Sequence, residues 1–103
     1  MTKRMMVILA TLILVIAVPA MASDGAALYK ASCTTCHGAN GAGDTPAGKA
    51  MKVRDLKAAE IQKQTDIELT KVISGGKGKM PAYGKKMSTA DIQAVIAFVR
   101  TLK

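Results

Sequence analysis

Residues 33–37 read Cys33-Thr34-Thr35-Cys36-His37, and this stretch holds both cysteines and the single histidine of a 103-residue chain. The Cys-x-x-Cys-His pattern is typical of covalent haem attachment. Two thiols about one helical turn apart match the two vinyl groups on one edge of a porphyrin, and the next residue then reaches the iron from one side. The motif therefore predicts one covalently bound haem c, attached through Cys33 and Cys36, with His37 as an iron ligand.

Three other interpretations of the two cysteines are possible. A simple disulfide requires only an oxidising compartment. A thioredoxin-like redox pair requires a strand-turn-helix setting, and no such pattern is readable around the motif. A zinc site requires about four ligands, and two cysteines with one histidine fall short of that number. Haem attachment is the interpretation that accounts for all three residues together.

The second iron ligand has to be something other than histidine, and Met80 is the best candidate. Met80 follows the glycine-rich segment 75–79, which lets the backbone swing over one face of a haem, and Pro81 stiffens the chain behind the sulfur. Met51 and Met87 are expected to fill gaps in the core instead. A thioether ligand stabilises ferrous iron, so His37/Met80 ligation predicts a raised reduction potential.

The N-terminus has the three parts of a secretory signal. A cationic start in residues 1–6 precedes the apolar run VILATLILVIAV at 7–18, and residues 20–22 have the small-x-small pattern that signal peptidase accepts. We therefore predict a cleaved signal peptide at 1–22, a single domain at 23–103, and export to a bacterial periplasm. The apolar run is shorter than the ~20 residues that a membrane-spanning helix needs, so no stable membrane insertion is expected.

Three segments show helical signals. Asp24 can cap a first helix over residues 24–33. A second helix begins at Thr65, where Thr65-x-x-Glu68 forms a capping box, and ends at the glycines 75–76. A third begins at Ser88 with another capping box. Its apolar stripe comprises Ile92, Val95, Ile96, Val99 and Leu102, with Phe98 at its edge; the stripe of the second helix comprises Leu69, Val72 and Ile73.

The rest of the chain predicts loops rather than strands. Residues 38–54 hold four glycines and a proline and are expected to form a loop, and residues 56–64 carry only a weak helical pattern. No alternating apolar pattern is found. The predicted fold class is all-α, with three to four helices and long loops wrapped around one haem. A chain of this size usually needs a cofactor or staple to complete its core.

The composition is basic, with a formal charge of +8 that falls to +6 once Lys3 and Arg4 are removed with the signal. A basic surface favours partners with acidic docking faces through electrostatic steering. Nucleic acid is not expected as a partner, because the lysines are scattered and the chain has no patch of stacking aromatic side chains.

These residues resemble those of class I cytochromes c, in the short bacterial single-haem branch, over nearly all of the chain after residue 22. The matching positions are Gly25, Tyr29, residues 33–37, Pro46, residues 79–83 and residues 96–99. The resemblance implies a fold in which the first and last helices cross, with Gly25 allowing a close approach and Phe98 packing near Gly25 and Tyr29.

The resemblance also implies details of the haem site. His37 and Met80 would bind iron from opposite sides, and the carbonyl of Pro46 would accept a hydrogen bond from the histidine ring. The chain lacks the tryptophan that some members place near a haem propionate, and Lys49, Lys52 or Arg54 would serve instead.

An electron carrier is the leading functional hypothesis, because a six-coordinate iron has no open site and no acid-base pair is legible. The protein is thus not expected to be an enzyme, and monomer is the default state. Lysines such as Lys79 and Lys85 would attract an acidic reductase or oxidase. The alternatives are a haem-based ligand sensor or weak peroxidase with a labile Met80, and an electron-entry domain of a larger redox complex.

Overall fold

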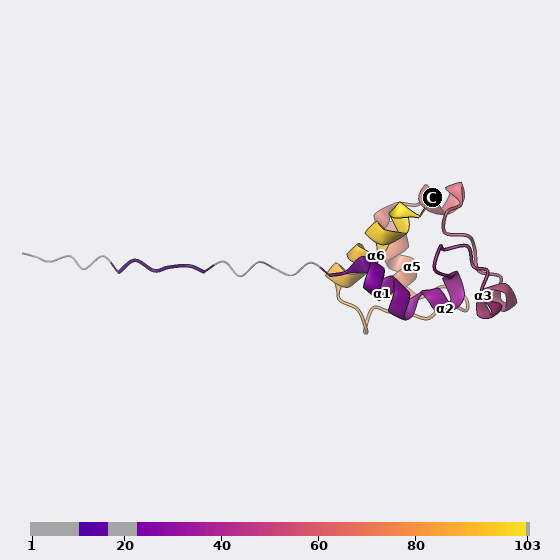
Figure 1. Ribbon diagram of the computed structural model, residues 1–103, viewed down its shortest axis with the longest axis horizontal. Coiled ribbons are helices and arrows are strands. Elements are labelled where there is room, and N and C mark those ends of the chain that lie inside the picture. Colours follow the sequence, from indigo (N-terminus) through magenta and orange to yellow (C-terminus); the bar gives the residue numbers. More distant parts are fainter. Residues whose placement is uncertain (1–10, 17–22, 103) are drawn as a thin grey trace, which may run out of the picture.

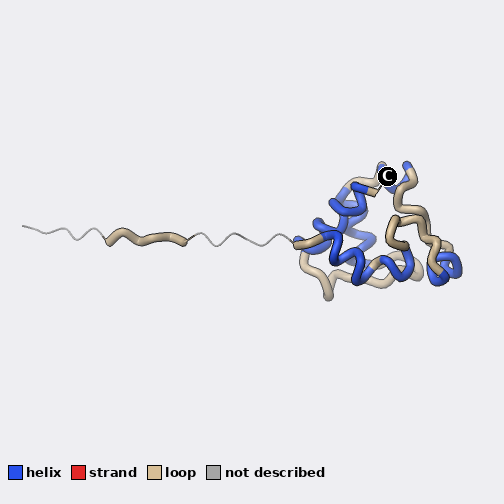
Figure 2. The backbone as a smooth tube through the Cα atoms, in the orientation of Figure 1, coloured by secondary structure: helices blue, strands red, loops and turns tan. Residues whose placement is uncertain are grey.

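The computed structural model describes residues 11–16 and 23–102 and contains helices and loops in those ranges, without a β-strand (Figures 1 and 2). The all-α prediction is confirmed. The helices are α1 (Gly25–Ser32), α2 (Thr34–His37), α3 (Pro46–Met51), α4 (Ala59–Gln62), α5 (Asp66–Gly75) and α6 (Thr89–Thr101). The three longest, α1, α5 and α6, are the three that the sequence predicts from their caps.

The predicted caps all form. The Asp24 carboxylate accepts a hydrogen bond from a first-turn amide of α1 at 3.1 Å. Both capping boxes are complete: Thr65 and Glu68 exchange side-chain-to-backbone hydrogen bonds at the start of α5, and Ser88 and Asp91 do the same at the start of α6. These bonds satisfy amide groups that have no partner inside the helix, which fixes where each helix begins.

The described residues form six helices, which is two more than the upper limit of the expected three to four. The weak pattern at 56–64 contains α4, but α2 and α3 have no counterpart in the prediction, and α3 lies inside the segment 38–54 that was expected to be a loop. The physical reason is local. Thr45 caps α3 by accepting a hydrogen bond from the Gly48 amide at 2.9 Å, and Pro46 occupies the first helical position, where its missing N–H costs nothing.

Helices α1 and α6 cross in close contact, as the resemblance implied (Figure 1). A Cβ atom on Gly25 would collide with the carbonyl group of Ala94, so only glycine permits this approach. Tyr29 and Phe98 pack beside the crossing in a tilted arrangement, with ring centroids 4.9 Å apart and an interplanar angle of 46°. The buried core cluster consists of Tyr29, Met87, Ile92, Val95, Ile96 and Val99.

Replacing Gly25 with alanine should destabilise the fold by about 2 kcal/mol or more, since the added methyl group meets rigid backbone rather than a movable side chain. Gly75→Ala is the matched control, because nothing lies within 4 Å of the methyl group it would add in α5. That control should leave stability unchanged or raise it by up to ~1 kcal/mol. Denaturant unfolding of the two variants checks this prediction, and equal stability of both would contradict it.

Arg100 ties the end of α6 to the connection between α4 and α5. Its guanidinium donates hydrogen bonds to the carbonyl groups of Gln62 at 2.8 Å and Gln64 at 2.5 Å, and forms an ion pair with Asp66 at 2.8 Å. The Arg100 side chain thus contacts three residues at or between the ends of α4 and α5, and it fixes this connection to α6.

The N-terminal predictions lie mostly outside the described residues. Residues 11–16 are exposed and have no regular secondary structure, and the expected cleavage point after Ala22 is not described. Within residues 23–102, no helix has both the length and the apolar character that crossing a membrane requires.

Candidate functional site

A cavity of about 310 Å³ opens between the helices and the loop that precedes α6. Cys33, Cys36, His37 and Met80 all line it, so the structure brings the four predicted site residues together. Most of the remaining lining is apolar. A mainly apolar cavity with a few convergent polar or metal-binding groups is typical of a cofactor site.

The apolar stripe of α5 lies between the core and this cavity, because Leu69 and Ile73 pack against the core cluster and also line the cavity. Leu69, Val72 and Ile73 line the cavity and stay partly exposed. Val95, Ile96 and Val99 of α6 also line the cavity, but they are more deeply buried. The stripe of α5 therefore presents apolar surface that a flat apolar cofactor would cover, which fits a haem.

Both cysteines are free thiols and partly buried, so the structure does not contain the disulfide that the sequence left open. Burial raises the pKa of the Cys33 thiol to about 11. The thiolate is the species that forms disulfides, and at neutral pH this thiol is overwhelmingly protonated.

His37 is the last residue of α2, and burial lowers the pKa of its imidazole. The ring is therefore neutral at pH 7, which is the form that binds a metal ion. Its Nδ1 atom is buried and has no hydrogen-bond partner. The hydrogen bond that was expected from the His37 ring to the Pro46 carbonyl is therefore not formed, and that prediction is wrong. Pro46 begins α3, so its carbonyl points along the helix axis toward the next turn.

Met80 lies in a defined turn, in contrast to the flexible segment expected from its glycines. Lys77 and Met80 exchange two backbone hydrogen bonds at 2.9 and 3.1 Å, and the amides of residues 83–84 bond to the carbonyls of residues 73–74 in α5 at 2.9 and 3.0 Å. Gly76 has a φ of 76°, and a Cβ atom there would lie 2.8 Å from the Met80 carbonyl oxygen. Glycine is thus required for the turn, and the turn holds Met80 at the cavity.

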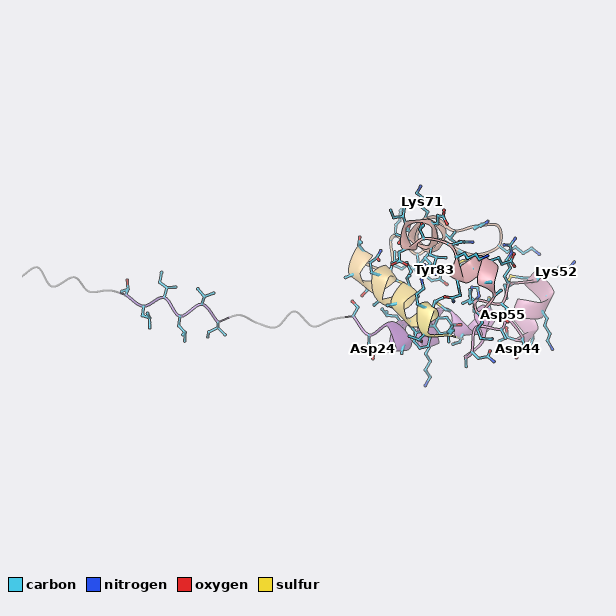
Figure 3. The ribbon with its side chains drawn as sticks, turned by 90° about the horizontal axis from the view of Figure 1, so that it is seen from above. Asp24, Asp44, Lys52, Asp55, Lys71 and Tyr83 are labelled. Carbon is cyan, nitrogen blue, oxygen red and sulfur yellow. The ribbon has the colours of Figure 1, made fainter. Side chains whose placement is uncertain are left out.

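Two tyrosine hydroxyl groups fix the backbone around the cysteine motif. Tyr29 donates to the Gly38 carbonyl at 2.7 Å, and Tyr83, in the middle of the helical body in Figure 3, donates to the Ser32 carbonyl at 3.1 Å. Burial, followed by the nearby Cys33, raises the pKa of Tyr29 to about 12, and burial also raises that of Tyr83. Both hydroxyls therefore remain donors at any physiological pH. The sequence carried no signal for either contact.

The charged side chains that line the cavity are all cationic: Lys52, Arg54, Lys77 and Lys79. Lys49, the other sequence candidate for contacting a propionate, is exposed and does not line the cavity. Lys52 is the one non-glycine residue with positive φ in the described part of the chain, at φ 53°. It caps the end of α3 in the left-handed conformation. The cavity rim is thus suited to a ligand with carboxylate groups.

Comparisons with known proteins agree with this geometry. The family model described as cytochrome C oxidase, cbb3-type, subunit III matches residues 20–99. The chain is 33% identical over 81 residues to the Cbb3-type cytochrome c oxidase subunit FixP of Azorhizobium caulinodans, covering 79% of this chain but only 27% of that relative. It is 34% identical over 76 residues to cytochrome c6 of Microcystis aeruginosa, covering 74% of this chain and 90% of that protein.

A solved structure shares the fold. The KustC0563 c-type cytochrome superposes with a TM-score of 0.72 at 32% identity, covering 78% of this chain and 98% of that one. Proteins of this kind hold a covalently bound haem c, and the free thiols, neutral histidine and apolar cavity described above fit that group. The chain therefore belongs to the class I c-type cytochromes, in the family described as cytochrome C oxidase, cbb3-type, subunit III.

Proposed function

We propose that this c-type cytochrome is an exported one-electron carrier, in which Cys33 and Cys36 would hold the haem and His37 and Met80 would bind its iron. The observation that carries the proposal is that all four residues line one apolar cavity, with Met80 held there by a hydrogen-bonded turn. When bound, the haem supplies one-electron chemistry, by alternating between ferric and ferrous iron.

Each ligand residue has a separate task. His37 presents a neutral ring, because burial lowers its pKa. Met80 presents a thioether, which favours ferrous iron and so raises the reduction potential. Met87 is buried in the core, and Met51 belongs to α3, which packs against the helix that carries His37. Met51 and Met87 also line the cavity, so the hydrogen-bonded turn that holds Met80 there is what supports Met80 as the second ligand. With two ligands, the iron would have no open position for a substrate.

The cations at the rim support a role in holding the haem carboxylates. Lys52 and Arg54 follow one another closely at the end of α3 and line the cavity, so either can pair with a propionate. Such pairing would offset negative charge near the iron, which would favour the less positive ferrous form and so raise the reduction potential.

The lysines of the Met80 turn support an acidic redox partner, a reductase or an oxidase. Lys77 and Lys79 are exposed at the cavity, while Lys85 is exposed but does not line it. The relatives include an oxidase subunit and a cytochrome c6, which are proteins that exchange electrons with others. The signal pattern at residues 1–22 supports a meeting in the periplasm.

Reversing the charges of the Met80 turn, with Lys77→Glu and Lys79→Glu, should slow electron transfer to an acidic redox protein by about tenfold or more at low salt. The matched control is Lys63→Glu with Lys71→Glu, which changes the net charge equally at exposed positions that do not line the cavity; Lys71 projects outward from α5 in Figure 3. Stopped-flow rates at several ionic strengths check this. Equal rates for both double variants at every salt concentration would rule out docking at the turn.

Absorption spectra of the periplasmically expressed protein test the proposal as a whole. A low-spin reduced spectrum that carbon monoxide leaves unchanged, with a methionine-iron charge-transfer band in the oxidised form, is the expected result. A spectral shift with carbon monoxide would mean that Met80 is labile or is not the ligand, and would favour the ligand sensor or weak peroxidase. Absence of haem from a strain with a working attachment system would overturn the assignment of Cys33 and Cys36.

A further inference from the structure

We infer that removal of the signal peptide creates an ion pair between the new α-ammonium group of Ser23 and the carboxylate of Asp91, and that this pair locks α1 onto α6. The inference rests on the proposed export, with cleavage after Ala22. It gives the processing step a second consequence, which is stabilisation of the mature fold.

The geometry brings the start of the mature chain to the start of α6. The Ser23 hydroxyl donates a hydrogen bond to Asp91 Oδ1 at 2.6 Å, although the two residues are 68 positions apart. Within one serine, covalent geometry keeps the backbone nitrogen within about 3.7 Å of the hydroxyl oxygen. The Ser23 nitrogen therefore lies within about 6 Å of the Asp91 carboxylate, which is the range over which opposite charges attract appreciably.

The two carboxylate oxygens of Asp91 have partners at the starts of two different helices, α1 and α6. Oδ2 accepts the Ser88 amide at 3.1 Å and completes the capping box of α6. Oδ1 faces Ser23 instead. One carboxylate thus caps its own helix and reaches the chain that enters α1.

The charge on the nitrogen changes when the signal is removed. In the precursor the Ser23 nitrogen is part of a neutral peptide group. In the mature chain it becomes an ammonium, placed just before α1, where the positive end of the helix dipole repels it. Asp24, at the point where the N-terminal segment meets the helices in Figure 3, caps α1, whereas Asp91 is the carboxylate that Ser23 already contacts across the helix pair.

The contact between Ser23 and Asp91 lies next to the crossing of α1 and α6. Gly25 sits two residues after Ser23, at the position where α1 meets the backbone of α6, and Tyr29 follows one helical turn later. An ion pair between Ser23 and Asp91, at the end of this crossing, restrains the first turn of α1, which would otherwise fray. Stabilisation by the pair is therefore expected in the mature protein and not in a chain whose amine lies elsewhere.

A double-mutant cycle on the haem-containing protein tests the inference. Its two changes are Asp91→Asn and an insertion of Gly-Ser-Gly between Ala22 and Ser23, which moves the amine by about 10 Å and beyond the screening length in physiological salt. Denaturant unfolding is measured for all four proteins, after mass spectrometry has established each N-terminus. Asp91→Asn should raise the unfolding equilibrium constant about twofold to fivefold more in the normal chain than in the extended chain.

The outcomes are distinguishable from those of the proposed function. Equal effects of Asp91→Asn in both chains would overturn the ion pair, since only its capping role would remain. A mature mass that does not begin at Ser23 would overturn the inference and the predicted cleavage, while the haem spectrum still tests the electron carrier. If Asp91→Asn does not fold, the normal and extended chains are compared directly: their difference in stability should shrink in 1 M salt, and a salt-independent difference would contradict the inference.

Discussion

A double variant with Cys33→Ser and Cys36→Ser is expected to contain no haem that survives denaturation, while the unchanged protein keeps all of its haem. Serine preserves the size of each side chain but forms no thioether bond to a vinyl group, so the only covalent link is lost. Haem staining of a denaturing gel and the intact mass measure this directly.

Loss of haem should also destabilise the fold. Leu69, Val72 and Ile73 line the cavity and stay partly exposed without a cofactor, so loss of haem removes part of the packing of α5 and leaves mainly its contact with α6. Proteolysis of the double variant should therefore begin in or next to α5. Thr35→Ala is the matched control inside the motif, because the Thr35 side chain is exposed and should leave both haem content and proteolytic resistance unchanged. Full haem retention in the double serine variant would refute covalent attachment at the motif.

The long helices were predictable because their signals are local. The capping boxes at Ser88 and Thr65 require only four consecutive residues, and the structure forms both. The stripe of α6 is periodic, and its first four members are buried. In these segments the local preference for helix agrees with the tertiary packing, so the sequence pattern is enough to predict the helices.

The short helices and the turn were less predictable, for different reasons. The pair Thr45-Pro46 is itself a helix-start signal, and the surrounding glycines concealed it. The end of α3 had no signal, because Lys52 adopts a left-handed conformation that glycine or asparagine usually takes. The turn before Met80 looked flexible, yet backbone bonds across it depend on which carbonyl groups of α5 come near, and that is a tertiary property.

The candidate site was predictable from chemistry, but its surroundings were not. The cysteines and the histidine are adjacent in sequence, and Met80 stands out by its neighbours. The hydrogen bonds of Tyr29 and Tyr83, by contrast, join segments separated by 9 and 51 residues, and Arg100 reaches across 38. No local pattern encodes which distant carbonyl a side chain will meet, so these contacts required the structure.

Replacing Met80 with alanine is expected to lower the reduction potential by a few hundred millivolts, within the ≈ 0.8 V range that axial ligands span. The thioether that favours ferrous iron is removed, and the iron gains an open position. Redox potentiometry measures the first effect, and the appearance of carbon monoxide binding measures the second. The methionine-iron charge-transfer band should disappear from the oxidised spectrum at the same time.

Met51→Leu and Met87→Leu are the controls that separate ligation from packing. Both side chains line the same cavity, and leucine nearly conserves their volume, so a packing role costs less than ~1.5 kcal/mol and leaves the potential almost unchanged. If Met51→Leu or Met87→Leu produced the large drop and Met80→Ala did not, the ligand would be the other methionine. The hydrogen bonds between Lys77 and Met80 argue against that result. Together with the backbone bonds from residues 83–84 to α5, they hold the turn in one conformation, which keeps the Met80 sulfur beside the cavity.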